Sequence, residues 1–223
     1  MVDTVYRTLT HMPRQSVPTT PELIAETALL IVDQQGPEAL SFRSLAARLE
    51  IPHATLQRRC TDMAGLLDMC TDHLAGQMPE IPAGTDWATA TECRFRALYD
   101  LLTGHPGLVV LRGPRPWLGP QLLKRLVEPQ LADSLAAGMT PEEAIVAYRR
   151  MYLLTLGSAS FVDHRDPKAA QSVTRAALAA LDPEEFPVLN GYISTIIPAV
   201  VDHEVYYGAL RQLIQSAHPA GSD

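Results

Sequence analysis

Residues 41–60, SFRSLAARLEIPHATLQRRC, decide the fold of this chain. Ser41 is a typical helix N-cap residue, and Pro52 opens a second short helix that is predicted over residues 53–60. The alanine pair at positions 46–47 allows two helices joined by so short a turn to cross closely. The segment is therefore predicted to be a helix-turn-helix, with a small apolar core made by Leu45, Leu49, Ile51 and Leu56.

The second of these helices carries polar side chains of the kinds that read DNA. Arginine binds phosphate and guanine, glutamine pairs with adenine, and threonine donates to phosphate. Pairs of helices with a solvated polar face are common, so periodicity alone leaves a plain helical hairpin open as well. The polar side chains on this helix are His53, Thr55, Gln57, Arg58 and Arg59.

Helical periodicity continues through the rest of the chain, and no convincing alternating strand accompanies it. One helix is expected from Pro21 until the pair Gly36-Pro37 stops it. A short helix is expected after Pro106. The other expected helices lie at about 62–78, 87–103, 118–137, 141–163, 167–181, 184–197 and 202–216. The chain is therefore predicted to be all-α.

The segment PEIPAGTD, residues 79–86, interrupts this pattern and predicts a domain boundary. Residues 1–18 lack a helical period and are expected to form a flexible N-terminal arm. Residues 19–79 are expected to form the helix-turn-helix domain. Residues 80–223 are expected to form a larger helical domain that binds an effector and dimerises.

Composition places this chain among soluble globular proteins. Its 223 residues are 47% hydrophobic, and its formal charge of −7 by itself argues against a nucleic-acid partner. Only Lys124 and Lys168 among the 18 basic residues are lysines, so nearly every cation is an arginine, the better residue for bidentate phosphate contacts. Neither an apolar signal segment nor a run of about 18 apolar residues is found, so the protein is expected in the cytoplasm, without a membrane partner.

The sequence carries none of the common catalytic or metal-binding motifs. Cys60, Cys70 and Cys93 lack CxxC spacing, and they are expected to be small buried hydrophobes, not a disulfide or a zinc site. No nucleophile elbow, zinc-protease motif, phosphate loop or glycine-rich dinucleotide fingerprint is found. An enzyme is therefore not expected, and no cofactor is predicted.

Two stretches carry a family resemblance: ETALLIVDQQGPEALSFRSLAARLEI at 26–51, and ATLQRRC followed by LLDMCTDHL within 54–74. Through them, residues 22–74 resemble the N-terminal domain of the TetR family of transcriptional regulators. The shared pattern is a turn from Gly36 to Ser41, then R-x-L-A-x-x-L, then alanine-threonine-leucine. Weaker similarity to the ligand-binding domain of the tetracycline-repressor branch follows in VVLRGPRP (109–116), residues 131–141 and TLG (155–157).

This resemblance implies a homodimeric transcriptional repressor. Each subunit would place its third helix in a major groove of a palindromic operator, as helix-turn-helix dimers do. A small molecule bound in the larger domain would lower the operator affinity. The operator contacts that the resemblance implies are Arg43, His53, Thr55, Gln57, Arg58 and Arg59.

Three positions depart from the family pattern. Glu50 stands where the turn usually has glycine, and a left-handed backbone there costs roughly 1 kcal/mol for a residue with a side chain. Gln57 replaces an aromatic residue and Met63 replaces a lysine, which removes two phosphate-directed groups. Residues 1–79 also hold six arginines against nine carboxylates, so weaker and more salt-sensitive operator binding is expected. The alternative is a ligand-binding or interaction protein of the same fold whose degenerate helix-turn-helix no longer binds DNA.

The larger domain is expected to enclose a mostly apolar ligand chamber with a few polar groups. The resemblance does not carry over a metal-tetracycline site, because Leu111 and Phe161 stand where that branch has a histidine and an acidic ligand. The expected effector is therefore small, largely apolar or aromatic, and free of metal. The same side chains are equally consistent with core packing or a dimer interface. The candidate lining residues are Phe95, Tyr99, His105, Arg115, Trp117, Tyr148, Met151 and Tyr152.

Overall fold

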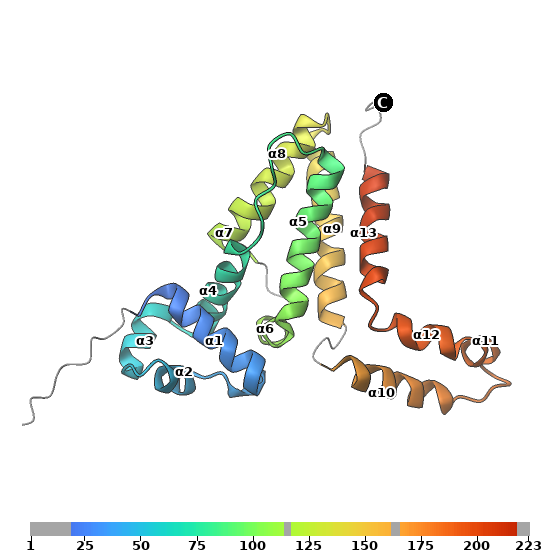
Figure 1. Cartoon of the computed structure of the whole chain (residues 1–223), viewed down its shortest axis with the longest axis horizontal. Helices are drawn as coiled ribbons and strands as arrows, with labels where there is room; N and C mark the ends of the chain where they lie inside the picture. The colour runs from blue at the N-terminus through green and yellow to red at the C-terminus, as the bar shows by residue number, and fades with distance from the viewer. Residues whose placement is uncertain (1–18, 114–116, 162–165, 218–223) are drawn as a thin grey trace, which may run out of the picture.

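The computed structural model describes residues 19–113, 117–161 and 166–217. Every regular element in these residues is helical, which confirms the predicted all-α class. Figure 1 shows a small group of helices at one end, a bundle of long helices beside it, and a helical extension that leaves the bundle. The candidate residue Arg115 lies outside the described residues.

The small group is formed by α1 (Pro21–Gln35), η1 (Pro37–Ala39), α2 (Phe42–Arg48), α3 (His53–Cys60) and α4 (Met63–Gly76). Side-chain caps start three of these helices: Thr20 accepts from the backbone of α1, Ser41 from α2 and Asp62 from α4. The predicted core is present, because Leu45 and Leu56 are fully buried. Leu49 and Ile51 pack against it as partly buried side chains.

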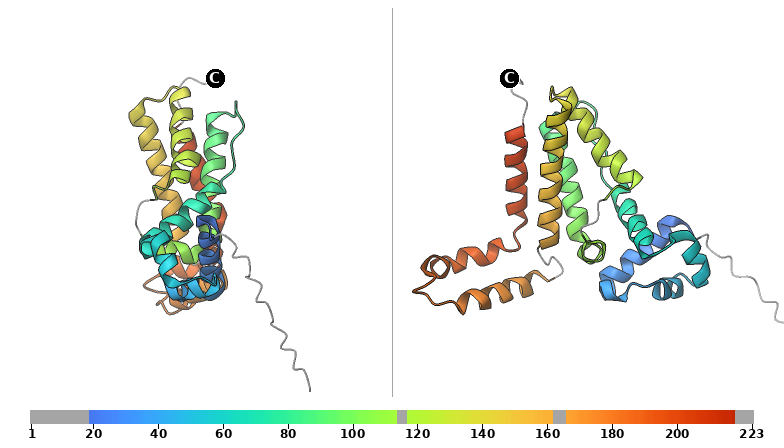
Figure 2. Two further views of the ribbon diagram at one scale, coloured as in Figure 1. Left: turned by 90° about the vertical axis from the view of Figure 1, so that its left-hand side faces the viewer. Right: turned by 180° about the vertical axis from the view of Figure 1, so that it is seen from behind.

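The bundle is built from α5 (Trp87–Gly104), α9 (Pro141–Phe161) and α13 (His203–Ala217), which lie side by side in Figures 1 and 2. Beside them run α7 (Pro120–Leu122), η2 (Leu123–Val127) and α8 (Glu128–Ala136). A helix was expected over 118–137, but η2 has π-helical hydrogen bonding. This widening directly precedes Pro129, which has no backbone N–H and whose ring would clash with the carbonyl four residues earlier in an α-helix.

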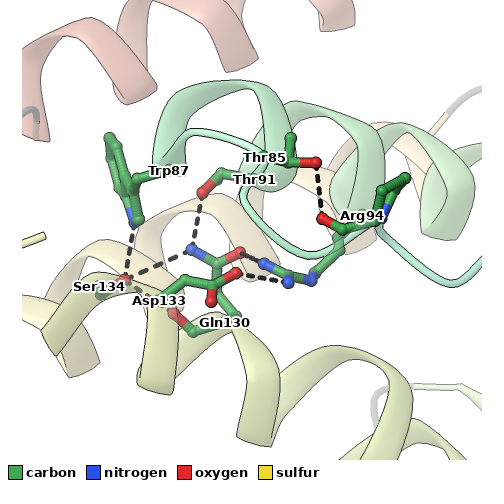
Figure 3. A network of polar contacts seen from close by, with 8 residues as sticks. Thr85, Trp87, Thr91, Arg94, Gln130, Asp133 and Ser134 are labelled. Atoms are coloured by element: carbon green, nitrogen blue, oxygen red, sulfur yellow. Dashed lines mark hydrogen bonds and ion pairs between the residues drawn. The ribbon is translucent and has the colours of Figure 1, made fainter. Parts of the chain in front are cut away.

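A buried polar network fixes α8 against α5 (Figure 3). The Gln130 amide donates to Thr91 Oγ1 at 2.8 Å and accepts from Arg94 Nη1 at 3.3 Å. Ser134 Oγ accepts from the Trp87 indole at 2.9 Å. Buried polar groups are costly unless they are paired, so this network fixes one register of the two helices.

The helical extension consists of α10 (Pro167–Ala179), α11 (Pro187–Gly191) and α12 (Ile193–Ala199). It projects away from the bundle in Figure 1 and in the right-hand view of Figure 2, and Ile197 is its one buried side chain among the described residues. The expectation of one continuous helix over 184–197 is wrong. The backbone leaves the helical region at Tyr192, where φ is −117° and ψ is 15°, and separates α11 from α12.

Two further sequence expectations can be compared with the structure. Cys60 and Cys70 are buried as expected, and burial raises the pKa of Cys70 to about 12. The expectation for Cys93 is wrong, because this residue lies on the exposed face of α5. In the described part of the chain, no helix combines the length and apolar character needed to cross a bilayer.

The short helix α6 (Pro106–Arg112) joins the bundle to the helix-turn-helix, because it contacts α1, η1 and α4 as well as α5 and α9. Gly107 makes this approach possible. A Cβ atom at this position would lie 2.5 Å from Cγ1 of Val32 in α1, which is closer than real side chains pack.

Gly107→Ala is therefore expected to lower the free energy of unfolding by about 1–3 kcal/mol, the usual cost of overpacking a core. Gly104→Ala is the matched control, because a Cβ there meets nothing within 4 Å. This control is expected to be neutral or to stabilise by up to about 1 kcal/mol. Urea unfolding of the two variants measures both effects, and equal midpoints would contradict close packing of α6 on α1.

Candidate nucleic-acid interface and effector chamber

The helix α3 presents the predicted polar side chains on one surface. Leu56 and Cys60 point into the core and hold the helix in place. The opposite face leaves His53, Gln57, Arg58 and Arg59 exposed and Thr55 half-buried. Arg43 of α2 is exposed as well. The structure thus brings five of the six predicted operator contacts together on α3, four of them exposed and Thr55 half-buried.

Two local contacts orient this surface. The imidazole of His53 meets the edge of Phe42, with ring centroids 6.0 Å apart, and so ties the start of α3 to the start of α2. Within α3, Arg58 Nη2 lies 3.5 Å from Thr55 Oγ1, one helical turn away. Arg58 is thereby held along the helix while its guanidinium stays accessible to an anion.

The turn between α2 and α3 has the geometry that the glycine-to-glutamate departure predicts. Glu50 has a φ of 54°, in the left-handed region that disfavours residues with a side chain. The backbone N–H of Ile51 donates to the carbonyl of Ala46 at 3.1 Å and closes the turn. Thr61, between α3 and α4, also has a positive φ of 61°, which the sequence pattern did not signal.

In the larger domain, most of the predicted chamber residues form one aromatic cluster: Phe95, Trp117, Tyr148, Met151 and Tyr152. The Phe95 ring lies 6.1 Å from Tyr148, which stacks on Tyr152 at 5.6 Å. Burial raises the pKa of both tyrosines, so their hydroxyls stay neutral at physiological pH. These side chains are buried or partly buried and pack on one another, with the phenolic hydroxyls among them.

Of the two other described candidates, Tyr99 belongs to the same buried core but packs against α13, whereas His105 lies outside that core. Tyr99 stacks on Tyr206 of α13 at 3.8 Å between ring centroids, and its hydroxyl lies 3.0 Å from His203 Nδ1. His105 stands at the corner between α5 and α6, where its Nδ1 lies 2.8 Å from Asp33 Oδ2 of α1. The surroundings of His105 are therefore those of a contact between the two parts of the molecule.

Arg112 at the end of α6 is a residue that the sequence analysis did not single out. Its side chain is only 3% exposed, and its guanidinium pairs with Asp68 of α4. The same guanidinium lies 5.6 Å from the ring centroid of Trp117, in the aromatic cluster. Arg112 thus contacts both the helix that follows the helix-turn-helix and the proposed chamber. Helical spacing could not reveal this role, because an arginine in the last turn of a helix is usually solvated.

Comparisons with known proteins agree with this geometry, although no family model matches the chain. An HTH-type transcriptional regulator of Saccharopolyspora erythraea is 27% identical over 176 residues, which are 77% of this chain and 74% of that regulator. The HTH-type transcriptional repressor DrrR1 of Streptomyces coeruleorubidus is 33% identical over 128 residues, which are 56% of this chain and less than half, 46%, of the repressor.

Among solved structures, the TetR family protein ActR of Streptomyces coelicolor in complex with actinorhodin superimposes with a TM-score of 0.73 at 25% identity. The match covers 92% of this chain and 99% of ActR. These findings confirm the resemblance seen in the sequence: the chain has the fold of the TetR-family transcriptional regulators. Its relatives are regulators of transcription, a family without enzymatic activity.

Replacing the strained residue of the turn provides a test of its geometry. Glu50→Gly is expected to raise the free energy of unfolding by up to about 1 kcal/mol, because glycine adopts a positive φ without steric cost. Glu50→Gln is the control, since it removes the charge and keeps the side chain, and it is expected to show no such gain in stability. Chemical denaturation measures both, and an equal gain in the two variants would show that charge, not backbone, is the cause.

Proposed function

We propose that the chain is a cytoplasmic, ligand-responsive transcriptional repressor that binds a palindromic operator as a homodimer. Binding of a small, largely apolar or aromatic effector, without metal, would release it from the DNA. The observation that carries this proposal is the exposed polar face of α3 on a fold whose relatives regulate transcription. The predicted domains, 19–79 for DNA and 80–223 for effector and partner, are part of the proposal.

The side chains of α3 support the DNA-binding half of the proposal. Arg58 and Arg59 can neutralise phosphates or reach guanine, and Gln57 suits adenine. Each phosphate that a cation neutralises releases counterions, so operator binding should depend steeply on salt. Arg43 lies on α2, the helix that in such motifs crosses the DNA backbone, and is suited to a phosphate contact.

The aromatic cluster supports the choice of effector. Its rings offer apolar faces to a flat ligand, and the buried tyrosine hydroxyls can orient a carbonyl or hydroxyl group on it. ActR, whose fold this chain shares, has been crystallised with actinorhodin and with (S)-DNPA. In the resemblance to tetracycline-binding members, the metal-binding histidine is replaced by Leu111, which supports an effector without metal.

Apolar side chains on the outside of the bundle support a homodimer. On α9, Ile145 and Leu153 lie two turns apart, and both are more than half exposed. On the helical extension, Val173 is 70% exposed and Val188 is 68% exposed. An apolar surface that the chain does not cover itself favours a partner, and a second copy is the partner that a palindromic operator requires.

The contacts of α6 support a route by which the effector could act on the helix-turn-helix. A ligand that enters the aromatic cluster would displace Trp117, which lies against the guanidinium of Arg112. Arg112 pairs with Asp68, so the displacement would reach α4 directly. The pair of His105 and Asp33 provides a second tie from the same helix corner to α1.

A specific observation favours the second candidate function, a ligand-binding or interaction protein without an operator. Glu50 places a carboxylate at the turn before α3, and Gln57 and Met63 lack the phosphate-directed groups of the family pattern. Glu50 has a positive φ in the structure, so the turn keeps the backbone conformation that glycine usually adopts and Glu50 carries its strain. The two candidates differ in one measurable property, which is sequence-specific binding to DNA.

The test is a gel shift with DNA that flanks the protein's own gene, at low and at moderate salt. Arg58→Ala and Arg59→Ala are each expected to weaken binding, and each should lower the slope of log affinity against log salt by about 0.9 if the arginine contacts a phosphate. Lys168→Ala is the control, because it removes one cation from α10, which belongs to the helical extension and not to the helix-turn-helix group (Figure 1). If the wild-type protein shifts no DNA at either salt concentration, the second candidate function is favoured.

The tie between α6 and α4 is tested by a double-mutant cycle of Asp68→Asn and Arg112→Met. Asp68→Asn is expected to cost about 1–2 kcal/mol of unfolding free energy, because it leaves a buried guanidinium without its carboxylate. In the Arg112→Met background the same change should cost much less. Urea unfolding measures all four proteins, with Glu142→Gln as the control for loss of one exposed charge, expected within about 0.5 kcal/mol. Additive effects would contradict a direct interaction.

A further inference from the structure

A cavity of about 270 Å³ lies where the loop after α4 meets α5 and η2. Its walls are the loop at 79–81, Arg94 of α5, and Lys124 and Arg125 of the π-helical segment η2. No residue of the aromatic cluster is among the described residues that line it. The cavity is therefore distinct from the proposed effector chamber.

The lining is cationic, and one cation is firmly positioned. Arg94 is 5% exposed and is held by Asp133, at 2.6 Å from Nη2, and by Gln130 (Figure 3). Its charge is balanced by the carboxylate of Asp133. Arg94 therefore contributes a rigid wall with N–H donors and little net charge.

The other two cations are less completely matched. Arg125 Nη1 pairs with Glu80 Oε1 at 2.5 Å, but its Nε–H is buried without a hydrogen-bond partner among the described residues. Lys124 is exposed, and no described carboxylate forms a salt bridge with it. A buried N–H without a partner is costly, so Arg125 would gain from a small shift of its guanidinium that lets an anion in the cavity accept from it.

The Glu80 carboxylate occupies the position at Arg125 that an anionic ligand would take. Its side chain is 83% exposed, and an exposed ion pair contributes little because water screens it and the long side chains lose freedom. A free anion can therefore displace it easily. With Glu80 displaced, Lys124 and Arg125 leave two positive charges uncompensated, which matches a dianion.

We propose that this cavity binds a phosphate-type dianion, which is either inorganic phosphate or the phosphoryl group of a small molecule. Arginine gives bidentate donors to phosphate oxygens, and lysine adds a point charge. The cavity is smaller than the roughly 300–1,000 Å³ of pockets for drug-sized ligands, so a compact group is favoured. The π-helical turn places Lys124 and Arg125 beside the loop, and such turns recur at functional sites. This proposal does not rest on DNA binding.

The test is calorimetric titration of the full chain with sodium phosphate, glycerol 3-phosphate and sodium chloride at matched ionic strength, in a buffer without phosphate. Saturable binding of phosphate, and none of chloride, is expected. Binding of glycerol 3-phosphate tighter than that of phosphate assigns the site to a phosphorylated small molecule, and the reverse assigns it to the free ion. Equal heats with phosphate and with chloride would overturn the proposal.

Four variants locate the site. Lys124→Gln is expected to weaken phosphate binding about tenfold, which is the loss of one charge-assisted contact. Arg125→Gln should weaken it by at least as much. Glu80→Gln is expected to tighten binding by up to about fivefold, because it removes the competing carboxylate. Lys168→Gln, on α10, should leave the affinity unchanged. Circular dichroism checks that each variant is folded, and an unchanged affinity in folded Lys124→Gln and Arg125→Gln would place the anion elsewhere.

Discussion

The relation between the two parts of this molecule depends on the buried guanidinium of Arg112. A charge that is 3% exposed must be compensated, and its compensation comes from Asp68 on one side and from the face of Trp117 on the other. Neither partner belongs to α6. These two partners therefore help to hold α6 between α4 and the aromatic cluster. Gly107 also holds the two parts together, because its lack of a side chain lets α6 lie directly on Val32 of α1.

The helix-turn-helix shows how little of a short helix is specified by its own sequence. Eight residues are too few for a stable isolated helix, so α3 exists because Leu56 and Cys60 are buried against its neighbours. That arrangement leaves the remaining faces free to carry arginines. The strained φ of Glu50 is tolerated for the same reason, since the burial of α2 and α3 on the common core fixes the path of the turn.

Caps and prolines explain why most helix boundaries were predictable from the sequence, and α3 was predicted at its observed ends. Local signals of that kind act within one turn. The π-helical widening at η2 and the break at Tyr192 were not predictable. Hydrophobic periodicity indicates which side of a helix is buried, but it does not show where the backbone hydrogen bonds depart from the α-helical pattern. The sequence also grouped Phe95, Trp117, Tyr148, Met151 and Tyr152 as candidate chamber residues, and the structure packs them in one core. The sequence could not show that His105 pairs with Asp33 of α1, or that Arg112 pairs with Asp68 of α4. Both partners are distant in the sequence.

The charge of −7 does not oppose the proposed DNA contact as directly as composition suggests. Exposed charges are screened beyond about 8 Å at physiological ionic strength, so the carboxylates of α9 and α13 contribute little at α3. The acidic residues that matter are the ones next to the helix, Glu50 before it and Asp62 after it. Asp62 is needed there, because its side chain caps α4 by accepting from Gly65 at 2.8 Å. Glu50 lies at the turn where the family pattern has an uncharged glycine, so its carboxylate is the charge by which this turn differs from that pattern.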